Sequence, residues 1–245
     1  MARYYPTEDS KLNVSRGLVQ DAEVRNINGY QVAGDTTLRA LWEFAATDYV
    51  FPTSAITMTV TSANTSDDGK SLLIKGLDDN YLEITDTVTI TGGGDVNTNI
   101  PFFRINDIML LTGTINVGLI TVQNTGKTVK YGGIRAGDGR NQASIFTVPA
   151  DHCFYLYRIE AFSNDSSSAK PANFRNYVRN ASGQEYNTKR ITFFNSMSIQ
   201  RRLPLKYDEK TDIEFQCSTN QGTHELSVNG EGLLIREPIA EPSVY

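Results

Sequence analysis

The sequence predicts an all-β protein of two tandem antiparallel β-sandwich domains, jelly-roll-like in type, behind an extended N-terminal arm. Apolar and polar residues alternate with period two along most of the chain after residue 55. Clusters of turn-forming residues recur about every ten residues, which is typical of sandwich strands. Only one short segment has helical periodicity. The 245 residues suit two domains of roughly 100 residues each.

Residues 1–35 show no sustained period of 2 or 3.6, and their apolar residues are isolated. Such a segment rarely builds its own core, so we expect an extended arm that lies on a partner surface. A disordered tail is the alternative, but aromatic residues are uncommon in disordered segments. The expected contact residues of the arm are Tyr4, Tyr5, Leu12, Val14, Leu18 and Val19.

The first domain is expected over residues 36–125. Leu38, Leu41 and Trp42 are spaced i, i+3, i+4, which favours one or two helical turns within residues 36–44, capped by Asp35. The tryptophan is interpreted as a plug of the domain core. The predicted strands are 56–61, 71–76, 82–90, 102–111 and 119–123.

The second domain is expected over residues 126–236, beginning at Gly126-Lys127, with a proline-broken tail at 237–245. Its predicted strands are 144–148, 153–162, 173–179, 190–199, 212–218 and 224–235. The strand 153–162 is apolar at most of its first positions, so we expect it to be covered on both faces. Cys217 shares a face with Ile213 and Phe215, which indicates a buried thiol, and no disulfide with Cys153 is expected.

Composition and charge narrow the class of protein. Hydrophobic residues make up 39 % of the chain, and no apolar run approaches the roughly 20 residues that span a bilayer. The N-terminus lacks an apolar signal segment, so we expect assembly in a cytoplasm. Residues 36–125 carry 4 basic and 10 acidic residues, more negative charge than the net -5 of the whole chain, and this acidity argues against a nucleic-acid partner there.

The residue types that form catalytic and metal sites do not occur at the spacings that such sites require. We therefore expect no enzyme activity, no cofactor and no metal. His152 and His224 lie in no nucleophile motif and are interpreted as structural. Asp67-Asp68 and Asp78-Asp79 flank one predicted hairpin strand and offer oxygen ligands for Ca²⁺, but aspartate is also typical of turns, which we favour. A pair of glycosidase carboxylates converges only in the folded chain and stays an open alternative.

Basic and aromatic residues interleave in the second domain. A sheet face that binds nucleic acid needs such residues together, but acidic residues are nearly as numerous in this domain, so we favour a subunit interface or a solvated face. Arg190, Arg201 and Arg202 are the expected contact residues. The full basic set is Arg175, Arg179, Lys189, Arg190, Arg201, Arg202 and Lys206, interleaved with Phe174, Tyr177, Tyr186, Phe193 and Phe194.

Several short motifs follow one another in an order that resembles a two-part structural protein common in tailed phages, particularly marine ones. The motifs include residues 51–55 (FPTSA), 75–92 (KGLDDNYLEITDTVTITG), 103–106 (FRIN), 136–142 (AGDGRNQ) and 146–150 (FTVPA). Residues 203–205 (LPL) and 210–214 (KTDIE) continue the order, so the resemblance covers about residues 50–235. Residues 207–209 (YDE) replace the expected proline-led turn, and residues 1–49 have no counterpart.

The resemblance implies a virion structural protein located in the particle, a capsid-decorating or tail-associated subunit. Its partners would be other virion proteins and further copies of itself, without nucleic acid or membrane. A receptor- or carbohydrate-binding module at a tail or fibre tip is the alternative. That module requires an exposed aromatic platform, for which Tyr81, Tyr131 and Tyr186 are the candidates. A glycan-cleaving tail enzyme is the third possibility.

Overall fold

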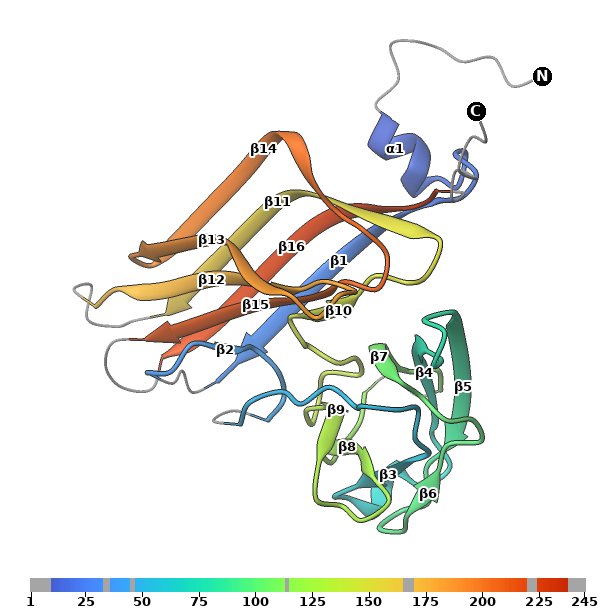
Figure 1. Cartoon of the computed structure of the whole chain (residues 1–245). Coiled ribbons are helices and arrows are strands. Elements are labelled where there is room, and N and C mark those ends of the chain that lie inside the picture. Colours follow the sequence, from blue (N-terminus) through green and yellow to red (C-terminus); the bar gives the residue numbers. More distant parts are fainter. Residues whose placement is uncertain are drawn as a thin grey trace, which may run out of the picture.

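The protein is an all-β structure with four antiparallel sheets. The computed structural model describes residues 10–32, 36–44, 47–112, 115–164, 170–219 and 224–237. Tyr4 and Tyr5 lie outside these residues, as do Asp35 and the tail beyond residue 237. Figure 1 shows a body with long strands and a separate body with short strands. We call them the large lobe (β1, β2 and β10–β16) and the small lobe (β3–β9).

The large lobe contains two sheets of long strands. The first sheet has the order β1 (Ala22–Gln31), β16 (Glu225–Arg236), β11 (His152–Asn164), β14 (Ser196–Tyr207). The second has the order β10 (Ile145–Thr147), β15 (Asp212–Thr219), β12 (Ala172–Arg179), β13 (Glu185–Phe193), and β2 (Arg39–Ala40) also pairs with β15.

The small lobe contains the two remaining sheets. One has the order β6 (Val96–Asn97), β3 (Met58–Ser62), β8 (Ile120–Asn124), β9 (Lys130–Ile134). The other has the order β5 (Glu83–Thr89), β4 (Ser71–Leu77), β7 (Arg104–Leu110). The described helices are α1 (Ser10–Ser15) and one 3-10 turn, Thr65–Asp67.

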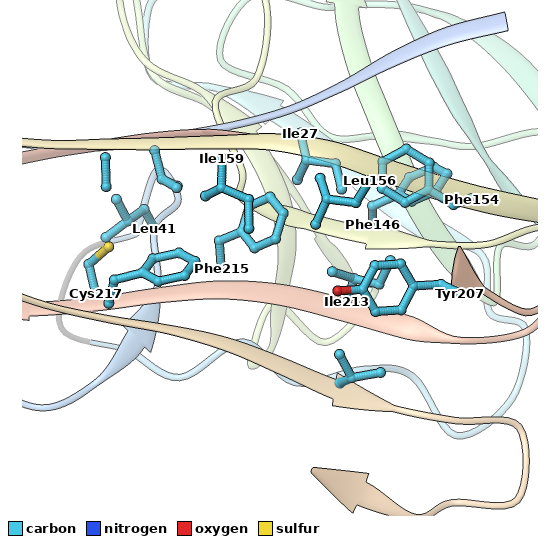
Figure 2. Close-up of a cluster of buried hydrophobic side chains, with 14 of the residues drawn as sticks. Ile27, Leu41, Phe146, Phe154, Leu156, Ile159, Tyr207, Ile213, Phe215 and Cys217 are labelled. Carbon is cyan, nitrogen blue, oxygen red and sulfur yellow. The ribbon is translucent and has the colours of Figure 1, made fainter. Parts of the chain in front are cut away.

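Each lobe has its own hydrophobic cluster, and the two clusters share no residue. In the large lobe, Phe154 and Ile159 of β11 face Ile213 and Phe215 of β15, and Figure 2 shows such side chains filling the space between strands of the two sheets. The alternation that predicted the strands is what directs these side chains to one face. Cys217 lies in this cluster as a free, buried thiol, as predicted.

The expected N-terminal arm is wrong for the part that the structure describes. Residues 10–15 form α1, and β1 pairs with β16 along ten residues, from Ala22↔Ile235 to Gln31↔Leu226. Ile27 is 3 % exposed and belongs to the large-lobe cluster. Strand β1 could not be predicted from alternation, because the inward positions on either side of Ile27 are occupied by Arg25 and Gly29 and not by apolar side chains.

The expected helix at residues 36–44 is also absent from the described residues there. Arg39–Ala40 forms β2, and Leu41 is buried in the large-lobe cluster. Trp42 instead packs edge-on against Phe44 and Tyr49, so its predicted burial is confirmed, but it belongs to the hydrophobic cluster of neither lobe. Leu41 and Trp42 pack against different residues, so the i, i+3, i+4 spacing that suggested one apolar helix face does not correspond to a shared face.

Two predicted boundaries also differ in the structure. Gly126-Lys127 does not begin a new unit but forms the hairpin turn between β8 and β9, with Lys127 at φ 56° and its N–H donating to the Asn124 carbonyl. The single strand predicted over 190–199 is two strands, β13 and β14, because the chain turns at Asn195, which has φ 56°. This turn moves the chain from one sheet of the large lobe to the other.

Polar contacts join the two lobes. Arg104 on β7 forms two hydrogen bonds with Asp212 on β15, at 2.9 and 3.1 Å. The side-chain amide of Asn106 exchanges hydrogen bonds with the backbone of Thr147 at 2.9 Å in both directions. Arg135 of the small lobe donates to the carbonyl oxygens of Tyr30 and Trp42. These contacts hold the two lobes, and therefore their outer edge strands, in a defined relative position.

Candidate interaction surface

The three predicted contact arginines, Arg190, Arg201 and Arg202, lie on β13 and β14. Among the described residues each strand pairs on one side only, β13 with β12 and β14 with β11, so each lies at the edge of its sheet. Most side chains of both strands are exposed. Edge strands carry unpaired N–H and C=O groups that can bind another chain. We call these two strands the basic edge.

Four cations on the basic edge form no ion pair with any described residue: Lys189, Arg190, Arg201 and Arg202. Lys189, Arg190 and Arg202 are exposed, and Arg201 is half-buried. By contrast, two other basic residues of this lobe form ion pairs: Arg179 with Glu185 at 3.0 Å and Lys206 with Glu237 at 3.0 Å. The structure thus places the three predicted arginines on two edge strands that follow one another in the chain.

β14 leaves its ladder where two of these arginines lie. The pairing with β11 jumps from Leu156↔Leu205 to Arg158↔Gln200, so residues 201–204 stand opposite Tyr157 alone. Pro204 lacks an N–H for the ladder, which suits such a bulge. Leu203 within it is 81 % exposed. The bulge therefore presents Arg201, Arg202 and Leu203 outside the regular sheet.

Two large aromatic side chains are exposed at the β13–β14 turn. Phe194 is 58 % exposed, and Phe162 at the end of β11 is 48 % exposed. The backbone N–H of Ser163 donates to the Asn195 carbonyl at 2.7 Å, which holds the end of β11 beside the turn. Full burial of a large apolar side chain by a partner would stabilise the complex by roughly 1.5–3 kcal/mol for each side chain.

Of the predicted contact residues of the N-terminal segment that the structure describes, three are exposed and one is buried. Leu12, Leu18 and Val19 are exposed, whereas Val14 is 7 % exposed and faces the protein. The ammonium of Lys11 lies 3.4 Å from the centre of the Tyr157 ring, so α1 is attached to the bulged position of β11. These residues do not lie on the basic edge strands.

The acidic pairs considered for Ca²⁺ are held by donors instead. Asp67 is buried and accepts from Ser62, Lys70, Val117 and Gly118 at 2.6–2.9 Å. Burial opposes its ionisation, but these hydrogen bonds prevail and hold the pKa of Asp67 well below its usual range.

The other three carboxylates of these pairs also accept backbone hydrogen bonds. Asp68 binds the Gly92 N–H, Asp78 binds those of Asn80 and Leu82, and Asp79 binds that of Ala55. Across the described part of the chain, no group of three or more His, Cys, Asp or Glu side chains is arranged to hold a metal ion.

The histidines and cysteines occupy structural positions. The Nδ1 of His152 lies 2.8 Å from the Ala150 carbonyl, and His224 is buried. Burial raises the pKa of Cys217 to about 12 and that of Cys153 to about 11, the latter with help from Glu237. A thiol with so high a pKa is a poor nucleophile.

The tyrosines considered for a carbohydrate platform are not equally available. Tyr131 is buried in the small-lobe cluster, Tyr81 packs edge-on against Phe103, and only Tyr186 on β13 is exposed. A polar pocket of about 440 Å³ lies over β12 and β15, lined among others by Arg39, Arg175 and Glu214. Burial raises the pKa of Glu214 to about 7, and Gln216 donates to this carboxyl at 2.7 Å.

The comparisons with known proteins give only distant similarities. No family model matches the chain, and no curated protein matches it. The solved PBSX exported protein XepA is 15 % identical over 86 % of each chain, with a TM-score of 0.18. The solved VP2 subviral particle of infectious bursal disease virus is 8 % identical over 89 % of this chain and 77 % of that chain, with a TM-score of 0.21. Similarities this low carry no argument about function.

The structure also bears on membrane insertion. None of the helices formed by the described residues is long and apolar enough to cross a membrane.

Proposed function

We propose that the chain is a non-enzymatic structural subunit of a tailed-phage particle, which acts by binding other virion proteins and copies of itself. In this proposal each lobe is a β-sandwich, and the subunit decorates the capsid or belongs to the tail. The observation that supports this proposal most strongly is the basic edge. Its cations form no ion pair with the described residues, and they lie on edge strands near exposed Leu203 and Phe194. The order of sequence motifs supports the same class.

The physical argument is that these groups remain unsatisfied in the single chain. Exposed edge strands bind further strands, and exposed apolar groups beside charges favour a protein partner. The histidines and thiols are held in structural positions, which favours a binding role over turnover. The proposed location is the assembled virion.

The proposal is tested by analysing gradient-purified particles with an antibody against this chain. We expect labelling at one defined location on intact particles by immunogold electron microscopy. Particles without label, with the protein only in the soluble fraction of the lysate, would refute the proposal. A glycan array separates the alternative: specific glycan binding that is lost in Glu214→Gln or Tyr186→Ala would favour a receptor-binding module.

A further inference from the structure

A second open edge lies on the small lobe and has the opposite charge. β5 pairs with β4 without a register shift along seven residues, Ser71↔Thr89 to Leu77↔Glu83, and with no strand of the described residues on its other side. Glu83, Thr85, Thr87 and Thr89 on its outer face are exposed. β5 contains no lysine, arginine or proline, the residues that commonly protect such edges.

The carboxylates of this edge also lack cationic partners among the described residues, although Asp78, Asp79 and Asp86 accept hydrogen bonds from N–H groups. Asp78, Asp79, Glu83 and Asp86 form no ion pair within the described part of the chain. They lie on β5 itself and on the turn that precedes it. We call β5 and this turn the acidic edge. One chain thus carries an acidic edge and a basic edge, both with free backbone groups.

Each edge has a regularly paired stretch, the whole of β5 and the part of β13 from Lys189 to Phe193, but the two edges do not meet within one chain. β13 has nine residues, and its part from Lys189 to Phe193 pairs regularly with β12. β14 is a poorer edge because its bulge at residues 201–204 interrupts the ladder. Figure 1 shows β5 and β13 on opposite sides of the molecule. A contact between them therefore requires two chains.

We propose that copies of this protein associate head to tail, with the β13 edge of one copy adding to the β5 edge of the next. The occupant of each edge is thus a second copy of this chain, and the inference rests on the proposed assembly function. Antiparallel or parallel addition would pair backbone groups that are otherwise left to water. Lys189 and Arg190 would face Glu83 and Asp86, and Arg201 and Arg202 would approach Asp78 and Asp79.

The charges also exclude the symmetric alternatives. Two β5 edges would bring carboxylates together, and two β13 edges would bring Lys189 and Arg190 together, and like charges across strands are destabilising. A contact between unlike surfaces is heterologous, so repetition gives a closed ring or an open filament. Either product suits a repeated component of a particle.

The test is self-association of the full chain, measured by sedimentation velocity over a range of concentrations at 50 and 500 mM NaCl. We expect wild-type association that weakens with salt, because exposed charge pairs are screened. Arg190→Glu and Glu83→Arg should each weaken association by roughly tenfold. Lys127→Glu is the matched control for Arg190→Glu, since it makes the same charge change on an exposed hairpin turn and should associate like wild type.

Restoration separates the proposed contact from misfolding. The double variant Glu83→Arg/Arg190→Glu exchanges the charges and should regain association. An equimolar mixture of the two single variants should also associate, because each edge then finds its complement on the other variant. A wild type that stays monomeric at all concentrations, or single variants that associate like wild type, would overturn the inference. So would single variants that neither the double variant nor the mixture restores. The proposed function fails separately, through absence of the protein from particles.

Discussion

Arg104 and Asp212 form a buried bidentate ion pair that links the small lobe to the large lobe. Nε and one Nη of Arg104 bond the two carboxylate oxygens of Asp212, and the side chains are 6 % and 5 % exposed. The Thr147 hydroxyl donates to the same carboxylate at 2.6 Å, and Arg104 also donates to the carbonyls of Pro52 and Phe103. The guanidinium lies over the Phe103 ring, 4.0 Å from its centre. Every polar atom of the pair is therefore engaged, as burial of two charges requires.

Removing one partner of this pair should destabilise the protein strongly. Arg104→Met leaves Asp212 as a buried, uncompensated charge, for which we expect a loss of about 3–5 kcal/mol in the free energy of unfolding. Adding Asp212→Leu to Arg104→Met should recover part of the loss. Urea denaturation measures both. If Arg104→Met costs no more than an exposed pair such as Lys127–Asp95 does, the pair does not join the lobes as described.

Stability should fall as pH rises from about 4.5 to 7. Burial raises the pKa of Glu43 and of Glu214 to about 7 from an ordinary value of 4.5, so the folded state binds more protons than the unfolded state in this window. Below the window both states are protonated, and no difference arises from these groups. Each carboxyl should account for at most about 3 kcal/mol.

Denaturation of glutamine variants at pH 5 and pH 7.5 checks this pH dependence. Glu43→Gln and Glu214→Gln keep an oxygen for the donors from Gln142 and Gln216 but cannot ionise. Each should lose less stability than wild type between the two pH values. Glu83→Gln, an exposed position, is the control and should follow wild type. A wild type that is more stable at pH 7.5 than at pH 5, with the same slope in every variant, would contradict the assignment.

The N-terminal segment should separate into a removable part and an essential part. Deleting residues 2–20 removes α1 and its contact with Tyr157 but leaves β1, so we expect a folded protein with cooperative thermal unfolding. Deleting residues 2–31 also removes the ten-residue ladder with β16 and Ile27 from the core, and we expect no cooperative transition. Calorimetry of both proteins decides this. Equal stability of the two would show that β1 is not part of the large-lobe core.

The thiols should be inert while the protein is folded. Their pKa values of about 11 and 12 leave little thiolate at pH 8, and both side chains are buried. Iodoacetamide at pH 8 should modify neither cysteine in the native protein, as measured by mass spectrometry, and both in guanidinium chloride. Native modification of Cys217 at the unfolded rate would mean that the large-lobe cluster opens readily.

The sequence predicts an all-β protein correctly because strand alternation is a local signal. Ser71–Leu77 and Asp212–Thr219 were found at almost their observed ends, since each places apolar residues at every second position. β1 was missed because its inward side chains include Arg25 and Gly29. Gly29 packs where an added Cβ would lie 2.5 Å from the Ser144 Cβ, so its value is a close approach between distant segments. No local pattern reports such an approach.

The candidate surface was predicted only in its residue types. Arg190, Arg201 and Arg202 were chosen from basic clustering, but their position on two sheet edges depends on the turn at Asn195 and the bulge at 201–204. The acidic edge was missed because the strand over 82–90 has the same alternation whether it is central or at an edge. The Arg104–Asp212 contact spans 108 residues, and neither residue has a neighbour in the chain that indicates its partner.

The number of copies of this chain in each purified phage particle tests the central proposal most directly. Quantitative mass spectrometry against an isotope-labelled standard, normalised to the major capsid protein, gives this number. A virion subunit predicts a fixed value that persists after washing in low-salt buffer: hundreds of copies for head decoration, or about six or twelve for a tail or connector component. Copies at far below one per particle, or a value that falls with each wash, would contradict the account.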